Sequence, residues 1–167
     1  MKESTQDVIR HMSVEEIPEC VNVIRVAFKT VADEFGFTQE NAPGFTAFAT
    51  DDQRIRYHFC VENRPMYVFL HQGRIVGYYS LALLDDGQVE LNNLSVLPEF
   101  RHRGIGQRLL EDCFEKVSRL GRKKLIIGIV EENTVLKKWY ESFGFKHVKS
   151  QKFDFFPFTC EYMEKVW

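Results

Sequence analysis

Hydrophobic residues recur at intervals of three and four along positions 105–120, and this spacing predicts an amphipathic helix with one buried face. The residues expected on that face are Ile105, Leu109, Leu110, Cys113, Phe114, Val117 and Leu120. An apolar strand is predicted before the helix, at residues 88–96. A short, continuously apolar run at residues 125–130 predicts a second strand, covered on both faces. Because parallel neighbours need a crossover helix, these segments predict a right-handed βαβ unit.

The N-terminal part of the chain predicts two further helices. Residues 13–16 have capping-box spacing, and apolar residues then follow at helical intervals to about Thr30. Pro18 fits only in the first helical turn, so the helix should begin nearer residue 16 than residue 14. Residues 35–50 contain four phenylalanines, one proline and two glycines, and predict a loop with short helical turns. Two aspartates then cap a second helix at about 53–61.

Between these helices and the βαβ unit, the hydrophobic period changes to that of strands. Three antiparallel strands joined by hairpin turns are predicted at residues 66–70, 74–84 and 88–96. In the third strand the alternation slips, because Val89 and Leu91 share one face while Leu94 and Val96 share the other. A bulge near residues 92–93 explains the slip, and a strand buried on both faces is the alternative.

The last part of the chain predicts a short helix and a hairpin. Asn133 or Thr134 begins the helix, which runs through Tyr140 and ends at Gly144. Residues 145–148 and 158–166 are then expected to pair as the final two strands.

Composition and charge narrow the possible functions. The 167 residues are 44% hydrophobic and 28% charged, which predicts one globular domain over residues 1–167. The formal net charge of −2 provides no general attraction for nucleic acid or an anionic membrane, so neither partner is expected. The four cysteines form no Cys-x-x-Cys motif, and the five histidines have no metal-ligand spacing, so no metal site is expected. The chain shows neither a signal-peptide pattern nor a membrane-spanning apolar run, and we expect a soluble, cytoplasmic protein.

One local cluster of positive charge precedes the long helix. Residues 101–106 read R-H-R-G-I-G, which places two arginines and two glycines at a helix N-terminus. The first N–H groups of a helix have no partner within it, and together with the helix dipole they attract anions. Glycine also allows a ligand to approach the main chain closely. This turn therefore predicts a site for a phosphate-bearing ligand.

The same turn resembles the (Arg/Gln)-x-x-Gly-x-(Gly/Ala) pyrophosphate loop of the GNAT N-acetyltransferase superfamily. The resemblance covers residues 89–145: it includes the preceding L-S-V-L-P-E-F and ends with E-E-N-T-V-L-K-K-W-Y-E-S-F-G-F, which is similar to that superfamily's closing strand, Asn, helix and Tyr-x-x-x-Gly-Phe segment. It implies a mixed α/β (α+β) fold in which an antiparallel meander is followed by a βαβ unit with splayed central strands.

The resemblance also implies a co-substrate, acetyl-CoA, and an amine acceptor. The implied cofactor-binding residues are Leu94, Ser95 and Val96 in the strand, Arg101, His102, Arg103, Gly104, Ile105 and Gly106 in the loop, and Asn133. The strand residues would pair with pantetheine through their main chain, and the arginines and the N–H groups around the glycines would hold the pyrophosphate. The His102 side chain is expected in solvent. Asn133 either bonds the CoA arm or simply caps its helix.

Two residues match catalytic positions of that superfamily. Glu90 lies eleven residues before Arg101, where many members carry a general base; the alternative is an outward-facing strand residue. Tyr140 lies seven residues after Asn133 and four before Gly144, where many relatives carry a tyrosine that protonates the CoA thiolate; the alternative is a core tyrosine.

The resemblance leaves the acceptor open. A small primary amine is the leading hypothesis, and Asp33 and Glu34 are candidates for attracting a cationic amine. A protein N-terminus or lysine side chain, and a CoA-binding regulatory module without catalysis, are the alternatives. A mononucleotide-binding Rossmann unit is disfavoured, because the glycine turn follows an antiparallel meander. A homodimer is compatible with the sequence, which does not determine the oligomeric state.

Overall fold

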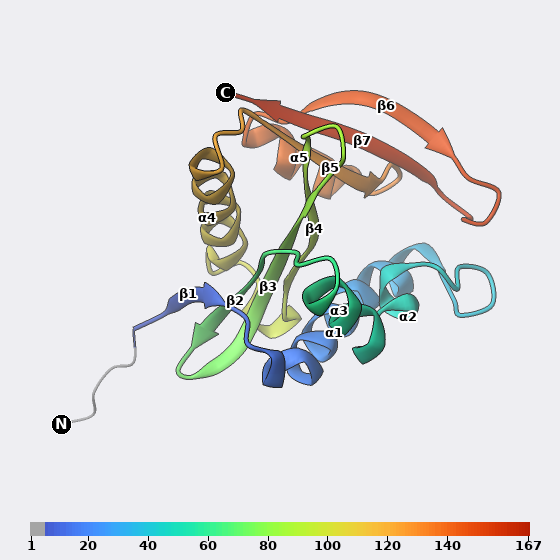
Figure 1. The fold of residues 1–167 in the computed structure, drawn as a ribbon. Helices are drawn as coiled ribbons and strands as arrows, with labels where there is room; N and C mark the ends of the chain where they lie inside the picture. Colours follow the sequence, from blue (N-terminus) through green and yellow to red (C-terminus); the bar gives the residue numbers. More distant parts are fainter. Residues whose placement is uncertain (1–5) are drawn as a thin grey trace.

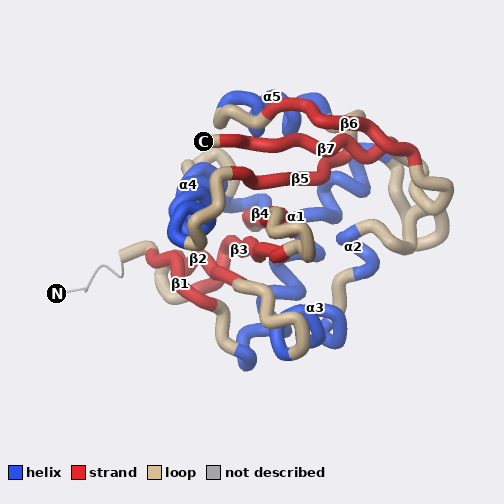
Figure 2. The backbone as a smooth tube through the Cα atoms, turned by 45° about the horizontal axis from the view of Figure 1, so that its top comes forward, coloured by secondary structure: helices blue, strands red, loops and turns tan. Residues whose placement is uncertain are grey.

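The computed structural model describes residues 6–167, and in this part of the chain a seven-stranded sheet has the order β1-β2-β3-β4-β5-β7-β6 (Figure 2). The strands are β1 Val8–His11, β2 Met66–His71, β3 Arg74–Leu83, β4 Val89–Val96, β5 Lys124–Val130, β6 Lys146–Lys152 and β7 Thr159–Val166. Neighbouring strands of this sheet are antiparallel except β4 and β5, which are parallel and joined through α4. The predicted fold class, with its meander and βαβ unit, is confirmed.

Helices cover both faces of the central strands (Figure 1). They are α1 Ile17–Phe35, α2 Thr46–Ala49, α3 Asp52–Cys60, α4 Ile105–Arg119 and α5 Thr134–Ser142, with 3₁₀ turns at Val14–Glu16 and Pro98–Phe100. The hydroxyl of Tyr79 on β3 donates to Asp112 of α4 at 2.6 Å, so alternation along β3 turns Tyr78 to the opposite face, where α1 packs. None of the helices in residues 6–167 has the length and apolar character needed to cross a membrane.

Two hydrophobic clusters stabilise this arrangement. The larger one joins β2 to β5 with α1 and α4, and includes the fully buried Tyr78, Tyr79, Phe69, Leu109 and Leu110. The smaller one packs the aromatic residues 35–48 against the β6–β7 connection; Phe37 and Phe158 lie with ring centroids 4.8 Å apart. The phenylalanines that the sequence placed in a loop thus form a core of their own.

Most predicted helices begin where expected, but their ends differ. The capping box is present, with the Ser13 N–H donating to Glu16 Oε1 at 2.9 Å, and Pro18 lies in the first turn of α1. The predicted end at Thr30 was too early: α1 continues to Phe35 and ends at Gly36, whose φ is +74°. Leu120 is 46% exposed, because it caps α4 and lies beyond its buried face.

Three strands also differ from what the sequence predicted. β1 was not predicted, because its sequence V-I-R-H has no clear alternation, and pairing with the edge of β2 decides its conformation. β6 extends to Lys152 rather than residue 148, although all seven of its residues are exposed. β5 is fully covered on one face only: Leu125, Ile127 and Ile129 are buried, whereas Gly128 is exposed.

Candidate active site

The parallel pair at the centre of the sheet is short. β4 and β5 pair only at Val89 with Leu125 and at Glu90 with Ile126. Farther along β4, Ser95 and Val96 pair on their other side with β3. The β5-facing main-chain edge of residues 94–96 is therefore left without a strand partner, which is the splayed arrangement predicted for the central strands.

A β-bulge lies at the point where the two strands part. Ser80 pairs with Asn92 and Tyr78 with Ser95, so Asn93 and Leu94 together oppose one residue of β3. Asn93 adopts φ +55°, and its carbonyl accepts a hydrogen bond from Ser95 Oγ at 2.8 Å. The bulge predicted near residues 92–93 is confirmed, and it turns the second half of β4 over relative to the first half.

The glycine turn, residues 101–106, follows the end of β4 that is not paired with β5. His102 and Gly104 adopt φ +61° and +80°, and α4 begins at the next residue, Ile105. A Cβ atom added at Gly104 would meet no protein atom within 4 Å, whereas one added at Gly106 would lie 3.6 Å from Trp139 of α5 and 3.9 Å from Val96. The N-terminus of α4 thus adjoins the end of β4 and the side of α5.

The two arginines of this turn have different surroundings. Arg101 donates from Nη1 to Thr30 Oγ1 and from Nη2 to the Ala27 carbonyl, both at 3.0 Å, and burial lowers its pKa. Its side chain therefore ties the turn to α1. Arg103 is exposed and lies over the Phe100 ring, with 5.2 Å from its Cζ to the ring centroid. Of the two guanidinium groups, that of Arg103 is the one available to a ligand from solvent.

Glu90 projects from β4 into a groove on the face opposite α4. The groove has a volume of about 440 Å³ and is lined by Gln88, Glu90, Lys124, Ile126, Val148, Lys149, Tyr162 and Glu164. Burial raises the pKa of Glu90 above its ordinary 4.5, and the positive charge of Arg64 partly opposes this shift. The carboxyl group therefore takes up a proton more readily than that of a solvated glutamate.

Tyr140 and Asn133 belong to α5. Tyr140 is only 6% exposed and packs edge-on against Phe145 at 5.3 Å between ring centroids. Burial raises its pKa, so the hydroxyl keeps its proton at neutral pH. The Asn133 side-chain oxygen accepts the Leu136 N–H at 3.2 Å. Asn133 therefore caps α5, which is one of the two roles considered for it from the sequence.

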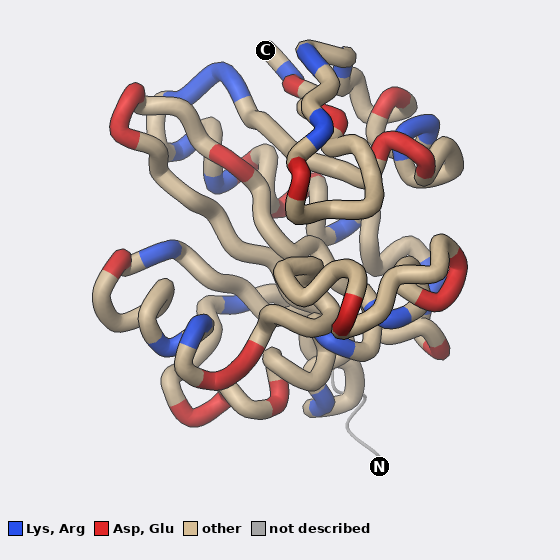
Figure 3. Tube along the Cα trace, turned by 90° about the vertical axis from the view of Figure 1, so that its right-hand side faces the viewer, with Lys and Arg blue, Asp and Glu red and all other residues tan. Residues whose placement is uncertain are grey.

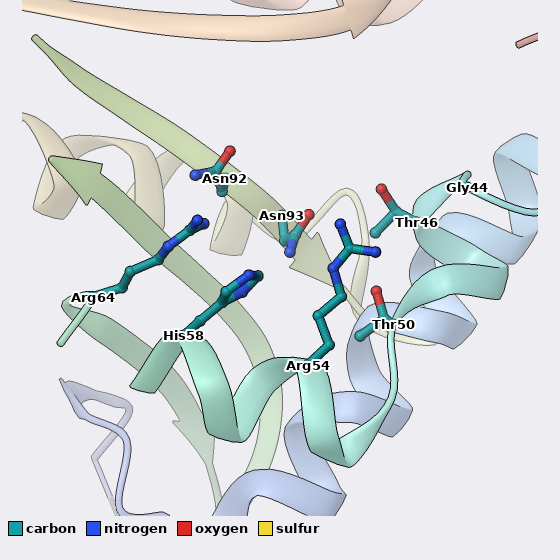
Figure 4. A pocket seen from close by; sticks show the side chains of 8 residues that line it. All are labelled: Gly44, Thr46, Thr50, Arg54, His58, Arg64, Asn92 and Asn93. Atoms are coloured by element: carbon teal, nitrogen blue, oxygen red, sulfur yellow. The ribbon is translucent and has the colours of Figure 1, made fainter. Parts of the chain in front are cut away.

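A second, polar pocket was not anticipated from the sequence. It lies between α3 and the β4 bulge, has a volume of about 110 Å³, and is drawn in Figure 4. Its lining residues are Gly44, Thr46, Thr50, Arg54, His58, Arg64, Asn92 and Asn93. The available signal was the four-residue spacing of Arg54 and His58, which places both side chains on one face of a helix.

Asp33 and Glu34, the candidates for attracting a cationic amine, lie apart from these features. Neither Asp33 nor Glu34 lines either pocket, and Asp33 forms an ion pair with Lys29. Basic and acidic residues are interspersed along the trace in Figure 3. Within residues 6–167, no group of three His, Cys, Asp or Glu side chains could hold a metal ion.

Comparisons with known proteins find chains of similar sequence and fold. An uncharacterised N-acetyltransferase from Lactobacillus delbrueckii subsp. lactis is 26% identical over 148 residues, which cover 81% of this chain and 82% of the relative. The crystal structure of the PaiA N-acetyltransferase from Thermoplasma acidophilum in complex with coenzyme A has a TM-score of 0.78 to this fold at 19% identity. The match covers 98% of this chain and 100% of that one. An Elizabethkingia anophelis GNAT family acetyltransferase with acetyl-CoA bound has a TM-score of 0.73 at 19% identity, covering 96% and 98%.

The family model described as "Acetyltransferase (GNAT) family" matches residues 31–145, well over half of the chain. This match includes the splayed β4–β5 pair, the glycine turn and the whole of α5. The chain therefore belongs to the GNAT acetyltransferase family.

Proposed function

We propose that this acetyltransferase transfers the acetyl group of acetyl-CoA to the primary amine of a small molecule. The main support is the parting of β4 from β5 beyond Glu90, next to the exposed N-terminus of α4. The pyrophosphate would bind the first N–H groups of α4 with help from Arg103. Pantetheine would pair with the free main-chain edge of residues 94–96.

The acceptor amine must lose a proton before it can attack. An alkylammonium with a pKa of about 10.4 is neutral in only about one molecule in 2,500 at pH 7. We assign Glu90 as the general base, acting directly or through one water molecule. Its raised pKa brings it closer to the working pH, which suits a base. The amine nitrogen then forms a bond to the thioester carbonyl carbon, and the carbon–sulfur bond breaks.

The departing thiolate of CoA needs a proton. Tyr140 is the proposed donor, and its burial supports this role by keeping the hydroxyl protonated. The alternative, a tyrosine that only packs in the core, rests on the same burial and on its contact with Phe145. Activity measurements distinguish the two roles, because the core function needs the ring and the acid needs the oxygen.

The preference for a small acceptor over a peptide rests on placing the acceptor at the polar pocket beside the β4 bulge rather than in the larger groove lined by Glu90. At about 110 Å³, the polar pocket accommodates a group of a few heavy atoms beside β4. An acetyltransferase for protein N-termini or lysine side chains, and a CoA-binding module without turnover, remain the competing hypotheses.

One assay decides among these three. Release of free CoA thiol from acetyl-CoA is followed with a panel of small primary amines and peptides, and the N-acetyl products are identified by mass spectrometry. Turnover with small amines supports the proposal. Turnover with peptides alone favours the protein acetyltransferase, and tight binding of acetyl-CoA without turnover on any acceptor favours the regulatory module.

A further inference from the structure

The polar pocket beside the β4 bulge is lined by hydrogen-bond donors, and none of its lining residues is acidic. In Figure 4 the guanidinium groups of Arg54 and Arg64 and the ring of His58 point toward the side of the pocket formed by Asn92 and Asn93. Guanidinium, amide and imidazole N–H groups suit an anion.

The elements around the pocket hold these donors in place. Asp51 caps α3 by accepting the Arg54 N–H at 2.8 Å, and Ile55, only 1% exposed, anchors the helix in the core. Arg54 and His58 therefore face β4 together. Arg64 donates from Nε to Glu62 Oε2 at 2.6 Å, which leaves its terminal nitrogens directed into the pocket.

The charge of the pocket is positive at neutral pH. Burial lowers the pKa of His58 below its ordinary 6.5, and Arg64 and Arg54 lower it further while Glu62 opposes them, so the imidazole is neutral at pH 7. Both arginines remain charged. Glu62 balances Arg64, and no ion pair joins Arg54 to an acidic residue in residues 6–167. The charge of the two arginines favours an anionic group at the pocket itself.

The pocket also lies next to the proposed base. Glu90 and Asn92 are two residues apart on one face of β4, which corresponds to about 7 Å along a strand. The charge of Arg64 acts on Glu90 as well as on His58. A molecule whose anionic end occupies the pocket could thus present an amine a few bonds away to Glu90.

We propose that this pocket binds the carboxylate of the acceptor, and that the acceptor is therefore a short amino acid, meaning a primary amine that carries a carboxylate. The inference rests on the proposed acetyl transfer and specifies its substrate class. A planar carboxylate can accept two parallel hydrogen bonds from one guanidinium group, which favours Arg54 as the main contact.

The test compares matched acceptors that differ only in charge. Three amino acids with increasing spacers (glycine, β-alanine and 4-aminobutanoate) are each paired with their carboxamide, and kcat/KM is expressed per neutral amine so that differences in amine pKa do not enter. We expect a preference for at least one carboxylate of about tenfold or more, the range for a hydrogen bond to a charged group. Equal use of every pair overturns the proposal.

Variants on α3 locate the effect. Arg54→Gln should lower kcat/KM for the preferred carboxylate about 10- to 100-fold and leave its carboxamide nearly unchanged. Arg56→Gln, on the same helix but exposed and outside the pocket, should change neither. An equal loss for carboxylate and carboxamide in Arg54→Gln would contradict the assignment.

A binding measurement separates this inference from the proposed function. If no amine is acetylated, acetyl transfer to a small amine fails, and the pocket is tested with 4-acetamidobutanoate and its carboxamide, using the NMR signals of the arginine Nε–H groups. Binding of the carboxylate about tenfold more tightly, lost in Arg54→Gln, supports the pocket assignment. Equal binding of the two probes overturns it.

Discussion

The contact between Arg101 and α1 leads to a prediction about stability. The Arg101 guanidinium donates to the Ala27 carbonyl and to Thr30 Oγ1, so it joins the glycine turn to a helix more than seventy residues away in sequence. Arg101→Met keeps much of the apolar stem and removes both donors. We expect the variant to lose stability more than affinity for acetyl-CoA.

The magnitude follows from the contacts that are lost. A hydrogen bond from a charged donor contributes about 1.5–3 kcal/mol. The Thr30 hydroxyl also donates to the Ala27 carbonyl at 2.8 Å, so this carbonyl keeps a partner in the variant and the lower part of the range applies to it. We expect a loss of about 2–4 kcal/mol in the free energy of unfolding, which lowers Tm by about 4–16 °C in a protein of this size.

The assay measures denaturation and acetyl-CoA binding in the same two variants. Arg103→Met is the matched control, because Arg103 is exposed and lies over the Phe100 ring; it should change stability by less than about 0.5 kcal/mol while weakening acetyl-CoA binding about tenfold or more. If Arg101→Met instead leaves Tm unchanged and weakens acetyl-CoA binding as Arg103→Met does, its guanidinium serves the ligand and the structural account is wrong.

Three further predictions concern the proposed site. Acetyl-CoA at a hundred times Kd should stabilise the wild type by about 2.7 kcal/mol in thermal melts, and Gly104→Val should abolish this shift. Gly121→Val is the control and should retain the shift, because Gly121 has a similar φ of +73° and no protein atom within 4 Å of an added Cβ. The kcat/KM should fall as pH drops through the raised pKa of Glu90, because protonation removes the base; a Glu90→Gln variant that keeps this acid limb would exclude Glu90. Tyr140→Phe should lower turnover about 10²- to 10⁴-fold with little change in Tm, and full turnover with a rate-limiting chemical step would leave Tyr140 a core residue.

Local periodicity determined most of the fold. The buried face of α4, the meander β2–β4 and the βαβ crossover follow from apolar spacing, because burying an apolar face requires the matching period of 3.6 or 2. The phase slip in β4 was enough to locate the bulge at Asn93. Periodicity failed for β1 and β6, whose conformation depends on pairing with a neighbouring strand rather than on their own apolar residues.

The glycine turn was also readable from the sequence, because its function depends on main-chain groups and on residues adjacent in the chain. Which of its arginines remains free was not readable. Arg101 contacts α1 through long-range packing, and only Arg103 is left exposed to solvent. Both positions are arginines beside the same glycines, so the sequence alone does not distinguish them. Only the tertiary contacts show which guanidinium group is free.

The polar pocket could not be predicted from the sequence, because only tertiary packing assembles it. Its donors come from α3, from the loop after α3 and from a strand bulge nearly thirty residues later, and each side chain alone reads as an ordinary surface residue. The sequence by itself determined the family fold, the glycine turn proposed to bind an anion and the candidates Glu90 and Tyr140, because these depend on local pattern. Only the folded chain brought Arg54, Arg64 and the bulge together, because electrostatic complementarity to a ligand depends on distances in space and not along the chain.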